Sequence, residues 1–421
     1  MSLATGFARF GRGLRDYGDN LRAFHPNARL YLISAVITGA TMGVFRLLLN
    51  FYALSMNYDE ALIGNLVTAS SLTALIFALP MGYAADFLGR KRSMILSALA
   101  TALVVLLMVW LPSKPMLIGA NVLLGLAQSL AGVTMGPFLM ENSTDRERTY
   151  LFSIASGLGT ASGFVGNWVG GYLPTWMGRL VGAAPTETAS YAAALLVIGI
   201  LAGLAAIPML FLRIPRLDAG GRSQFAPLSY LKGHAGMLGK LILPMLITSI
   251  GAGLIMPFMN VFFRLQHNQP DPVIGSLFAW GSLAMAVGML IAPPLAERTG
   301  KIQLVVITQG LSIPFLALLG FSPWFAAAAF AYYIRVGLMN MSGPVYQTFV
   351  MEKVDPGSRA TVASLVSMAN SFGWAFSPTI SGWLQVGYGF APAFIGTIVL
   401  YTISVFFYWY FFLHGGRQGK S

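Results

Sequence analysis

Long stretches without a charged residue are the feature that most limits the fold of this chain. Residues 61–85, 115–140 and 273–296 contain no Asp, Glu, Lys or Arg. Each stretch is long enough to cross a bilayer as a helix, which takes about 20 mostly apolar residues. Only 10% of the 421 residues are charged, whereas a globular domain carries roughly 25%. Most of the surface must therefore face lipid.

Turn signals rich in Gly and Pro divide this apolar sequence into separate helices. The longest uncharged run, residues 360–416, is interrupted at residues 385–392, where two glycines and a proline follow closely. Placing every break in this way predicts an all-α protein with twelve transmembrane helices. The predicted spans are 30–56, 61–85, 93–112, 116–140, 150–173, 189–213, 240–265, 273–296, 302–321, 324–350, 360–384 and 391–413.

The basic residues lie mostly on one side of these spans. They occupy the first 29 residues, the loops that follow even-numbered spans, the central loop and the C-terminal tail. Because cytoplasmic loops carry an excess of Lys and Arg, both termini are predicted to be cytoplasmic, in a multi-pass protein of the plasma (cell inner) membrane. Topology thus explains the net charge of +12, and no nucleic-acid partner is expected.

Six matched pairs of residues share one separation of 211 positions. The pairs are Gly64 with Gly275, Asp86 with Glu297, Gly89 with Gly300, Glu141 with Glu352, Arg148 with Arg359, and Gly171 with Gly382. This constant offset indicates an internal duplication. Since each copy holds six spans, an axis along the membrane normal should relate the copies. The predicted division is a segment 1–29, a six-helix bundle 30–213, a central loop 214–238, a second bundle 239–414 and a tail 415–421.

The loop between the second and third spans carries a specific motif. Residues 82–92 read GYAADFLGRKR, and residues 293–301 read PPLAERTGK. The first motif resembles the loop signature of the major facilitator superfamily, and the second is a weaker copy of it. The resemblance implies two six-helix bundles, with these loops latching one state of a transport cycle from the cytoplasmic side. The predicted gating residues are Gly82, Asp86, Gly89, Arg90, Glu141, Arg148, Glu297, Gly300, Lys301, Glu352 and Arg359.

In this interpretation, Gly89 permits a short turn between a carboxylate at one helix end and basic residues at the next. The resemblance suggests that Glu141 receives Arg90, and that Glu352 receives Arg298 or Lys301. Such charge-assisted contacts are stronger than neutral ones. Two simpler explanations stay open, because the basic residues could fix topology alone and the acids at the helix ends could be solvated independently.

The fifth and eleventh spans contain small residues at close spacing. Residues 166–171 read GNWVGG, and residues 373–382 read GWAFSPTISG. Both resemble a motif of antiporters in this superfamily, although Asn167 stands where Pro is expected and serines replace glycines in the second copy. Close helix packing is an equally good explanation. The residues concerned are Gly166, Gly170, Gly171, Pro378 and Gly382.

Two arginines lie deep within predicted spans. Arg46 is in the first span and Arg335 is near the middle of the tenth; an unpaired Arg at such depth costs about 2.5 to 3.5 kcal/mol. The resemblance implies that the first and tenth spans line one central cavity, so the candidate substrate-binding residues are Arg46, Asn50, Arg335, Tyr332 and Asn340. The alternative is that both arginines are structural. Arg264, near an outer helix end, is expected to reach the interface beside His267.

Acidic residues are confined to tails, loops and helix ends, and the chain has no cysteine. No catalytic group, metal site or cofactor is predicted, so an enzyme is not expected, although a polytopic membrane enzyme is the alternative from another class. The preferred function is secondary transport of a small organic solute, anionic or amphiphilic, by alternating access in an antiporter-like branch. An exporter of neutral or lipophilic drugs or lipids is the nearer alternative, and a coupling proton or ion is left open.

Overall fold

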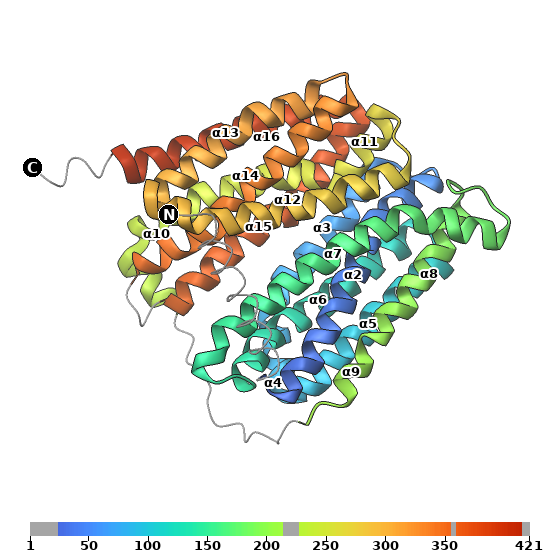
Figure 1. The fold of residues 1–421 in the computed structure, drawn as a ribbon, viewed down its shortest axis with the longest axis horizontal. Helices are drawn as coiled ribbons and strands as arrows, with labels where there is room; N and C mark the ends of the chain where they lie inside the picture. Colours follow the sequence, from blue (N-terminus) through green and yellow to red (C-terminus); the bar gives the residue numbers. More distant parts are fainter. Residues whose placement is uncertain (1–23, 214–226, 355–358, 415–421) are drawn as a thin grey trace, which may run out of the picture.

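The computed structural model describes residues 24–213, 227–354 and 359–414, and within these ranges every regular element is helical. The helices form two groups that follow one another along the chain, coloured blue to green and yellow to red in Figure 1. The first group contains α2 (Pro26–Ser55), α3 (Glu60–Ile76), α4 (Ala78–Leu88), α5 (Arg90–Trp110), α6 (Lys114–Glu141), α7 (Asp145–Val181), α8 (Thr188–Leu204) and α9 (Ala206–Leu210).

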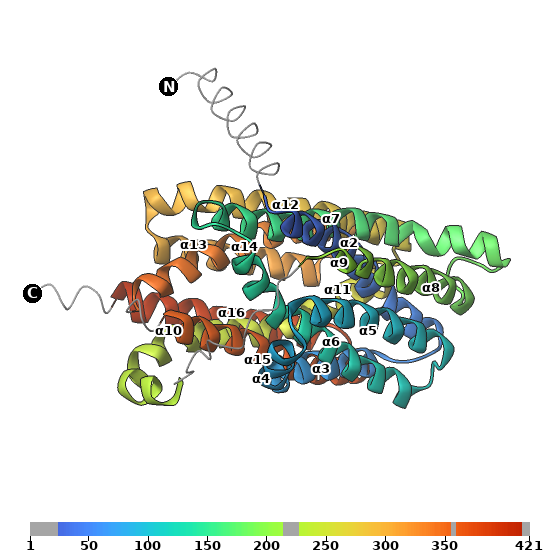
Figure 2. The same cartoon turned by 90° about the horizontal axis from the view of Figure 1, so that it is seen from below.

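The second group has the same plan. It contains α10 (Pro227–Ile255), η1 (Met256–Phe258), α11 (Met259–His267), α12 (Asp271–Thr299), α13 (Lys301–Phe321), α14 (Phe325–Glu352), α15 (Arg359–Tyr388), α16 (Ala391–Trp409) and the short turn η3 (Tyr410–His414). The helices of each group run side by side along a common direction in both views (Figures 1 and 2).

Most of these helices could cross a membrane. Among the described residues, eight helices are long and apolar enough, and the bent pair α3 and α4 makes a ninth. Three others, α7, α14 and α15, have 37, 28 and 30 residues and carry more polar side chains. Together they make two bundles of six spans, which confirms the predicted fold class.

The internal repeat is visible in the helix bounds. The helix α5 begins and ends 211 positions before α13, and α6 has the same relation to α14. The turns that precede α5 and α13 are also alike, because Gly89 and Gly300 have φ of 81° and 92°. Such values suit glycine and strain other residues. The repeat therefore extends to the bounds of these helices and to the turns that precede α5 and α13.

Two spans are less regular than the sequence predicts. The second span is broken at Phe77, where α3 and α4 meet at 61°. The seventh span is broken at η1, where Pro257 lacks the N–H that a continuous helix needs. The helix α10 also begins at Pro227, within the predicted central loop 214–238, and kinks at His234.

The two halves share a core at one end and have separate cores at the other. Buried residues of both halves, including Phe51, Tyr191 and Phe262, form a single cluster toward the end where α12 begins, which we call the Asp271 end. Toward the end that holds the turns at Gly89 and Gly300, which we call the motif end, each half has its own cluster. Accordingly, the ribbons diverge toward α4 and α10 in Figure 1.

Candidate functional site

A cavity of about 510 Å³ lies between the halves. The first half contributes walls from α2, α3, α6 and α7, and the second half contributes η1, α11, α12 and α15. Aromatic and sulfur-containing side chains line part of it, including Met42, Phe45, Met256, Phe278 and Trp374. The polar lining residues are Arg46, Asn50, Ser70, Ser71, Asn121, Gln128, Asn167 and Asn260. A volume of this size suits a small organic molecule.

Arg46 is the one charged side chain among the described residues that line the cavity. It is exposed to the cavity, and its guanidinium makes no hydrogen bond or ion pair with the described part of the chain. A guanidinium offers five N–H donors in a planar fork that fits carboxylates and phosphates. The cavity therefore presents a cation with all its donors free.

Asn50, one helical turn beyond Arg46, holds the two halves together instead of facing the cavity freely. Its side-chain amide donates to the carbonyl of Pro257 at 2.8 Å and to Oδ1 of Asn260 at 2.9 Å. Asn260 in turn donates to the carbonyl of Leu47 at 3.0 Å. These reciprocal bonds close the cavity on its Asp271 side.

The other three predicted binding residues do not line the cavity in this conformation. Arg335 is 2% exposed, with Nη2 donating to the Tyr401 hydroxyl at 3.1 Å and Nη1 lying 3.5 Å from Sδ of Met256. Tyr332 is buried behind Phe278, and Asn340 donates to the carbonyl of Val336 in its own helix. The structure thus does not bring Arg46 and Arg335 to opposite walls of one open cleft, because side chains of η1 and α12 stand between.

Sequence reasoning missed most of the polar lining. Asn121 and Gln128 are seven positions apart in α6, which places them on one face of that helix. That spacing of polar residues within an apolar span was a usable signal. Asn167 stands where the antiporter motif has Pro. In the structure this polar residue lines the cavity.

The halves touch through glycines at two crossings near the Asp271 end. Gly275 of α12 lies so close to α7 that an added Cβ would be 2.6 Å from the carbonyl oxygen of Asn167. At the second crossing, Gly64 of α3 meets the carbonyl of Pro378, and Gly382 meets that of Glu60. The contact of Gly64 with Pro378 and that of Gly275 with Asn167 join equivalent positions, since each residue of one pair lies 211 positions from a residue of the other. The two crossings are therefore copies. Of the remaining packing residues, Gly166 and Gly170 contact α2 within the first half, and Gly171 contacts Asp271.

A buried carboxylate at the start of α12 also joins the halves. Asp271 is 7% exposed. Its Oδ2 accepts a hydrogen bond of 2.5 Å from the Tyr191 hydroxyl of the first half, and Oδ1 lies 3.5 Å from Nη1 of Arg264. Arg264 does not reach an outer interface as expected, because its guanidinium turns inward onto the Phe51 ring, 4.5 Å from the ring centroid.

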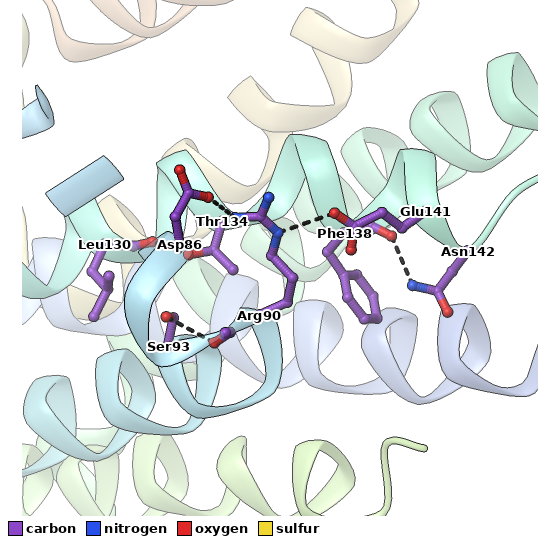
Figure 3. Close-up of polar contacts among 9 residues, drawn as sticks. Asp86, Arg90, Ser93, Leu130, Thr134, Phe138, Glu141 and Asn142 are labelled. Carbon is purple, nitrogen blue, oxygen red and sulfur yellow. Dashed lines mark hydrogen bonds and ion pairs between the residues drawn. The ribbon is translucent and has the colours of Figure 1, made fainter. Parts of the chain in front are cut away.

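At the motif end, the predicted gating residues pair within each half. Arg90 lies between Asp86, at 2.8 Å, and Glu141, at 3.2 Å, as Figure 3 shows. In the second half, Lys301 contacts Glu352, and this pair stands 211 positions from Arg90 and Glu141. The pairings that the motif suggests are therefore present in both copies. Asp86 remains 70% exposed, which leaves it free to contact other groups.

The remaining motif residues make fewer contacts in this conformation. Glu297 is exposed, and no heavy atom beyond the neighbouring turns lies within 4 Å of a Cβ placed on Gly82. The side chains of Arg148 and Arg359 lie outside the described part of the structure. The hydrogen bonds between the halves that the described side chains make all lie on the Asp271 side of the molecule.

Comparisons with solved structures show which known folds this chain resembles. The nucleoside transporter NupG, in a mutant form, aligns with a TM-score of 0.75 at 16% identity, covering 92% of this chain and 100% of that chain. A bacterial homologue of the human lysosomal transporter Spinster, in an inward-facing and occupied conformation, aligns with a TM-score of 0.77 at 14% identity, covering 91% and 95%. The chain therefore has the fold of a membrane transporter. A search of curated proteins gives no match.

The family follows from the sequence itself. The model of the major facilitator superfamily matches residues 31–378 and 241–420, which together take in almost the whole chain. The chain belongs to the major facilitator superfamily. It is thus a multi-pass membrane protein of a family of transporters for small molecules.

Proposed function

We propose that this protein is a secondary active transporter of a small organic anion, working by alternating access in the plasma membrane. The observation that carries the proposal is Arg46, a cation without a partner in a cavity of transporter fold. Amides and hydroxyls around it could hydrogen-bond to an oxyanion, and the aromatic and methionine side chains could hold an apolar body. A structural Arg46 would be expected to have carbonyl or acid partners.

The direction in which the cavity opens follows from charge. The motif end carries Arg90, Lys91 and Arg92, so the excess of basic residues favours placing this end in the cytoplasm. The halves are joined at the opposite, Asp271 end, and therefore the described conformation is the inward-facing one in this proposal. Alternation would part the glycine crossings and bring the motif ends together, where Asp86 is free to reach the second half.

Ligand binding to detergent-purified protein tests the proposal. Carboxylates, phosphate monoesters and sulfonates are compared with an amide and an amine of the same carbon skeleton, by thermal shift. A ligand that binds the folded state raises its stability by mass action. We expect the anions to stabilise the wild type, and Arg46→Gln to lose about tenfold or more in affinity, the scale of one charge-assisted hydrogen bond.

Arg179→Gln is the matched control, because Arg179 is exposed at the end of α7, outside the cavity. It should bind the anions as the wild type does. Equal binding of the amide and the anion, or unchanged anion binding by Arg46→Gln, would favour the alternative of a neutral or lipophilic substrate. Counterflow in proteoliposomes with the best ligand then separates a carrier from a protein that binds without transport.

A further inference from the structure

The two halves are copies, but among the described residues only the first half lines the cavity with its fourth span, α6. The equivalent helix of the second half, α14, does not line it. In α6, the face formed by Asn121, Leu124 and Gln128 lines the cavity. The positions 211 residues later, in α14, are Tyr332, Arg335 and Met339, and none of these three lines it. Since α6 and α14 have matching bounds, the repeat places this second face toward the same central space.

The residue that covers Arg335 belongs to the break in the seventh span. Met256 lines the cavity with part of its side chain, and its Sδ lies 3.5 Å from Nη1 of Arg335. Arg335 is thus separated from the cavity by the thickness of one flexible side chain. Methionine is unbranched and changes rotamer easily, so it is a suitable movable cover.

The guanidinium of Arg335 has too few hydrogen-bond partners and, within the described ranges, no counter-ion in this conformation. Its contacts are the Tyr401 hydroxyl, the Met256 sulfur and the Tyr401 ring, and its buried Nε has no hydrogen-bond partner in the described structure. No carboxylate is paired with it among the described residues. Burial of a charge without a counter-ion is unfavourable, and access to an anion would relieve it.

The break that carries Met256 is held by one bond from each half. The Asn50 amide donates to the carbonyl of Pro257 at 2.8 Å, and the Ser381 hydroxyl donates to that of Leu254. The bond from Asn50 crosses between the halves, so it must part when the Asp271 end opens. Opening therefore removes one of the two bonds that hold the segment with Met256 over Arg335.

We propose that Tyr332, Arg335 and Met339 form a second wall of the binding site, which opens as the halves rock. In this conformation Met256 covers Arg335 and Phe278 covers Tyr332. Arg335 is then a second cation for the substrate, and the solute is one with two acidic groups, or one doubly charged group. This inference rests on the proposed function, because Arg46 is the first cation of the pair.

The test measures charge inside the cavity without knowing the substrate. The chain has no cysteine, so Ser71→Cys introduces a single thiol into the cavity wall with little change of shape. Its rates of reaction with an anionic and a cationic methanethiosulfonate of similar size are compared. The ratio of the two rates reports the local potential, since a change in thiol ionisation affects both reagents equally.

All further variants are made in the Ser71→Cys background. Met256→Ala should raise the ratio of anionic to cationic rate about tenfold, the scale of one added unit charge in a partly desolvated site. Adding Arg335→Gln should return the ratio to its starting value, whereas Arg335→Lys should keep it raised. Met256→Leu keeps the cover, and Met42→Ala removes a methionine from the opposite wall; neither should change the ratio.

The outcomes separate this inference from the function on which it rests. An unchanged ratio in Met256→Ala, or a rise that persists with Arg335→Gln, overturns the second wall. If Arg46→Gln lowers the starting ratio in that case, the proposed anion site still stands. If Arg46→Gln leaves the ratio unchanged, the proposed anion site fails on its own account, whatever Met256→Ala shows.

Discussion

At the scale of single residues, the most telling contact is the one between Asp271 and Tyr191. It joins the halves, it is buried, and it leaves Arg264 held between the carboxylate and the Phe51 ring. A buried carboxylate that loses a donor is left partly unsatisfied, at a cost of about 1 to 3 kcal/mol. The Tyr191 hydroxyl is therefore one of the groups that hold the Asp271 end closed.

Tyr191→Phe should weaken this closure while keeping the ring in place. We expect a lower thermal unfolding temperature in detergent and faster alkylation of a thiol introduced at Thr68, which contacts α15 across the interface. Tyr58→Phe is the control, because the Tyr58 hydroxyl donates to the Pro112 carbonyl at an exposed position. Similar behaviour of the two variants would show that Tyr191 has no special part in closure.

The same residues show what sequence reasoning could and could not supply. Arg46 was recognisable because a charge within an apolar span is costly wherever it points. The burial of Asp271 was not recognisable, since a carboxylate at a helix start is usually solvated and only the approach of the other half covers it. Arg335 was correctly seen as deep, but its separation from the cavity depends on a break in another helix.

At the scale of helices, the glycine crossings set how closely the halves approach. A Cβ on Gly275 would lie 2.6 Å from the Asn167 carbonyl and 2.9 Å from the Gly171 nitrogen, and both are backbone atoms that cannot turn away. Helix pairs in membranes depend on such small residues for close packing. The offset pattern revealed these glycines, whereas their partners emerged only from the crossing of the helices.

Gly275→Ala should force α12 away from α7 and destabilise the conformation described here. Overpacking of this kind costs roughly 1 to 3 kcal/mol, which should appear as a lower unfolding temperature. Gly119→Ala is the matched change, because Gly119 lies in α6 with open space around it. There the gain in helix propensity should leave stability unchanged or slightly higher. Equal loss in both variants would contradict a role for the crossing.

Helix breaks were harder to foresee than helices. Pro257 marks one break, and there the sequence contained a signal. At the break at Phe77 the signal is Pro80 in the first turn of α4, which has no N–H to donate to the carbonyl of Ile76 four residues earlier. Many prolines within helices cause smaller bends, as Pro137 in α6 and Pro314 in α13 lie in helices that continue unbroken, so the sequence alone did not predict a bend of 61°.

At the scale of the whole molecule, the described side chains hydrogen-bond the two halves to each other at the Asp271 end and not at the motif end. Thr379 of α15 donates to Asn65 of α3 at 2.9 Å across the joined end. A thiol pair introduced by Asn65→Cys and Thr379→Cys should cross-link readily, directly or through a short bifunctional reagent, in a chain that has no other cysteine.

The cross-linked protein should bind ligand and yet fail to transport it, because the joined end can no longer part. Reduction should restore transport, and each single variant should remain active under the same oxidising conditions. Transport at the normal rate by fully cross-linked protein would show that the cycle does not require the Asp271 end to open, and alternating access in the proposed form would be excluded.

The bend between α3 and α4 implies that the two copies have different mechanical properties. The position equivalent to Phe77 is Gly288, where α12 continues unbroken and packs on Gly337 of α14. The span of the first half is bent at this position. The equivalent span of the second half is a continuous helix there. Backbone amides near residue 77 should consequently exchange with solvent deuterium faster than those near residue 288. Of these two equivalent spans, the one in the first half would then be the more flexible during transport.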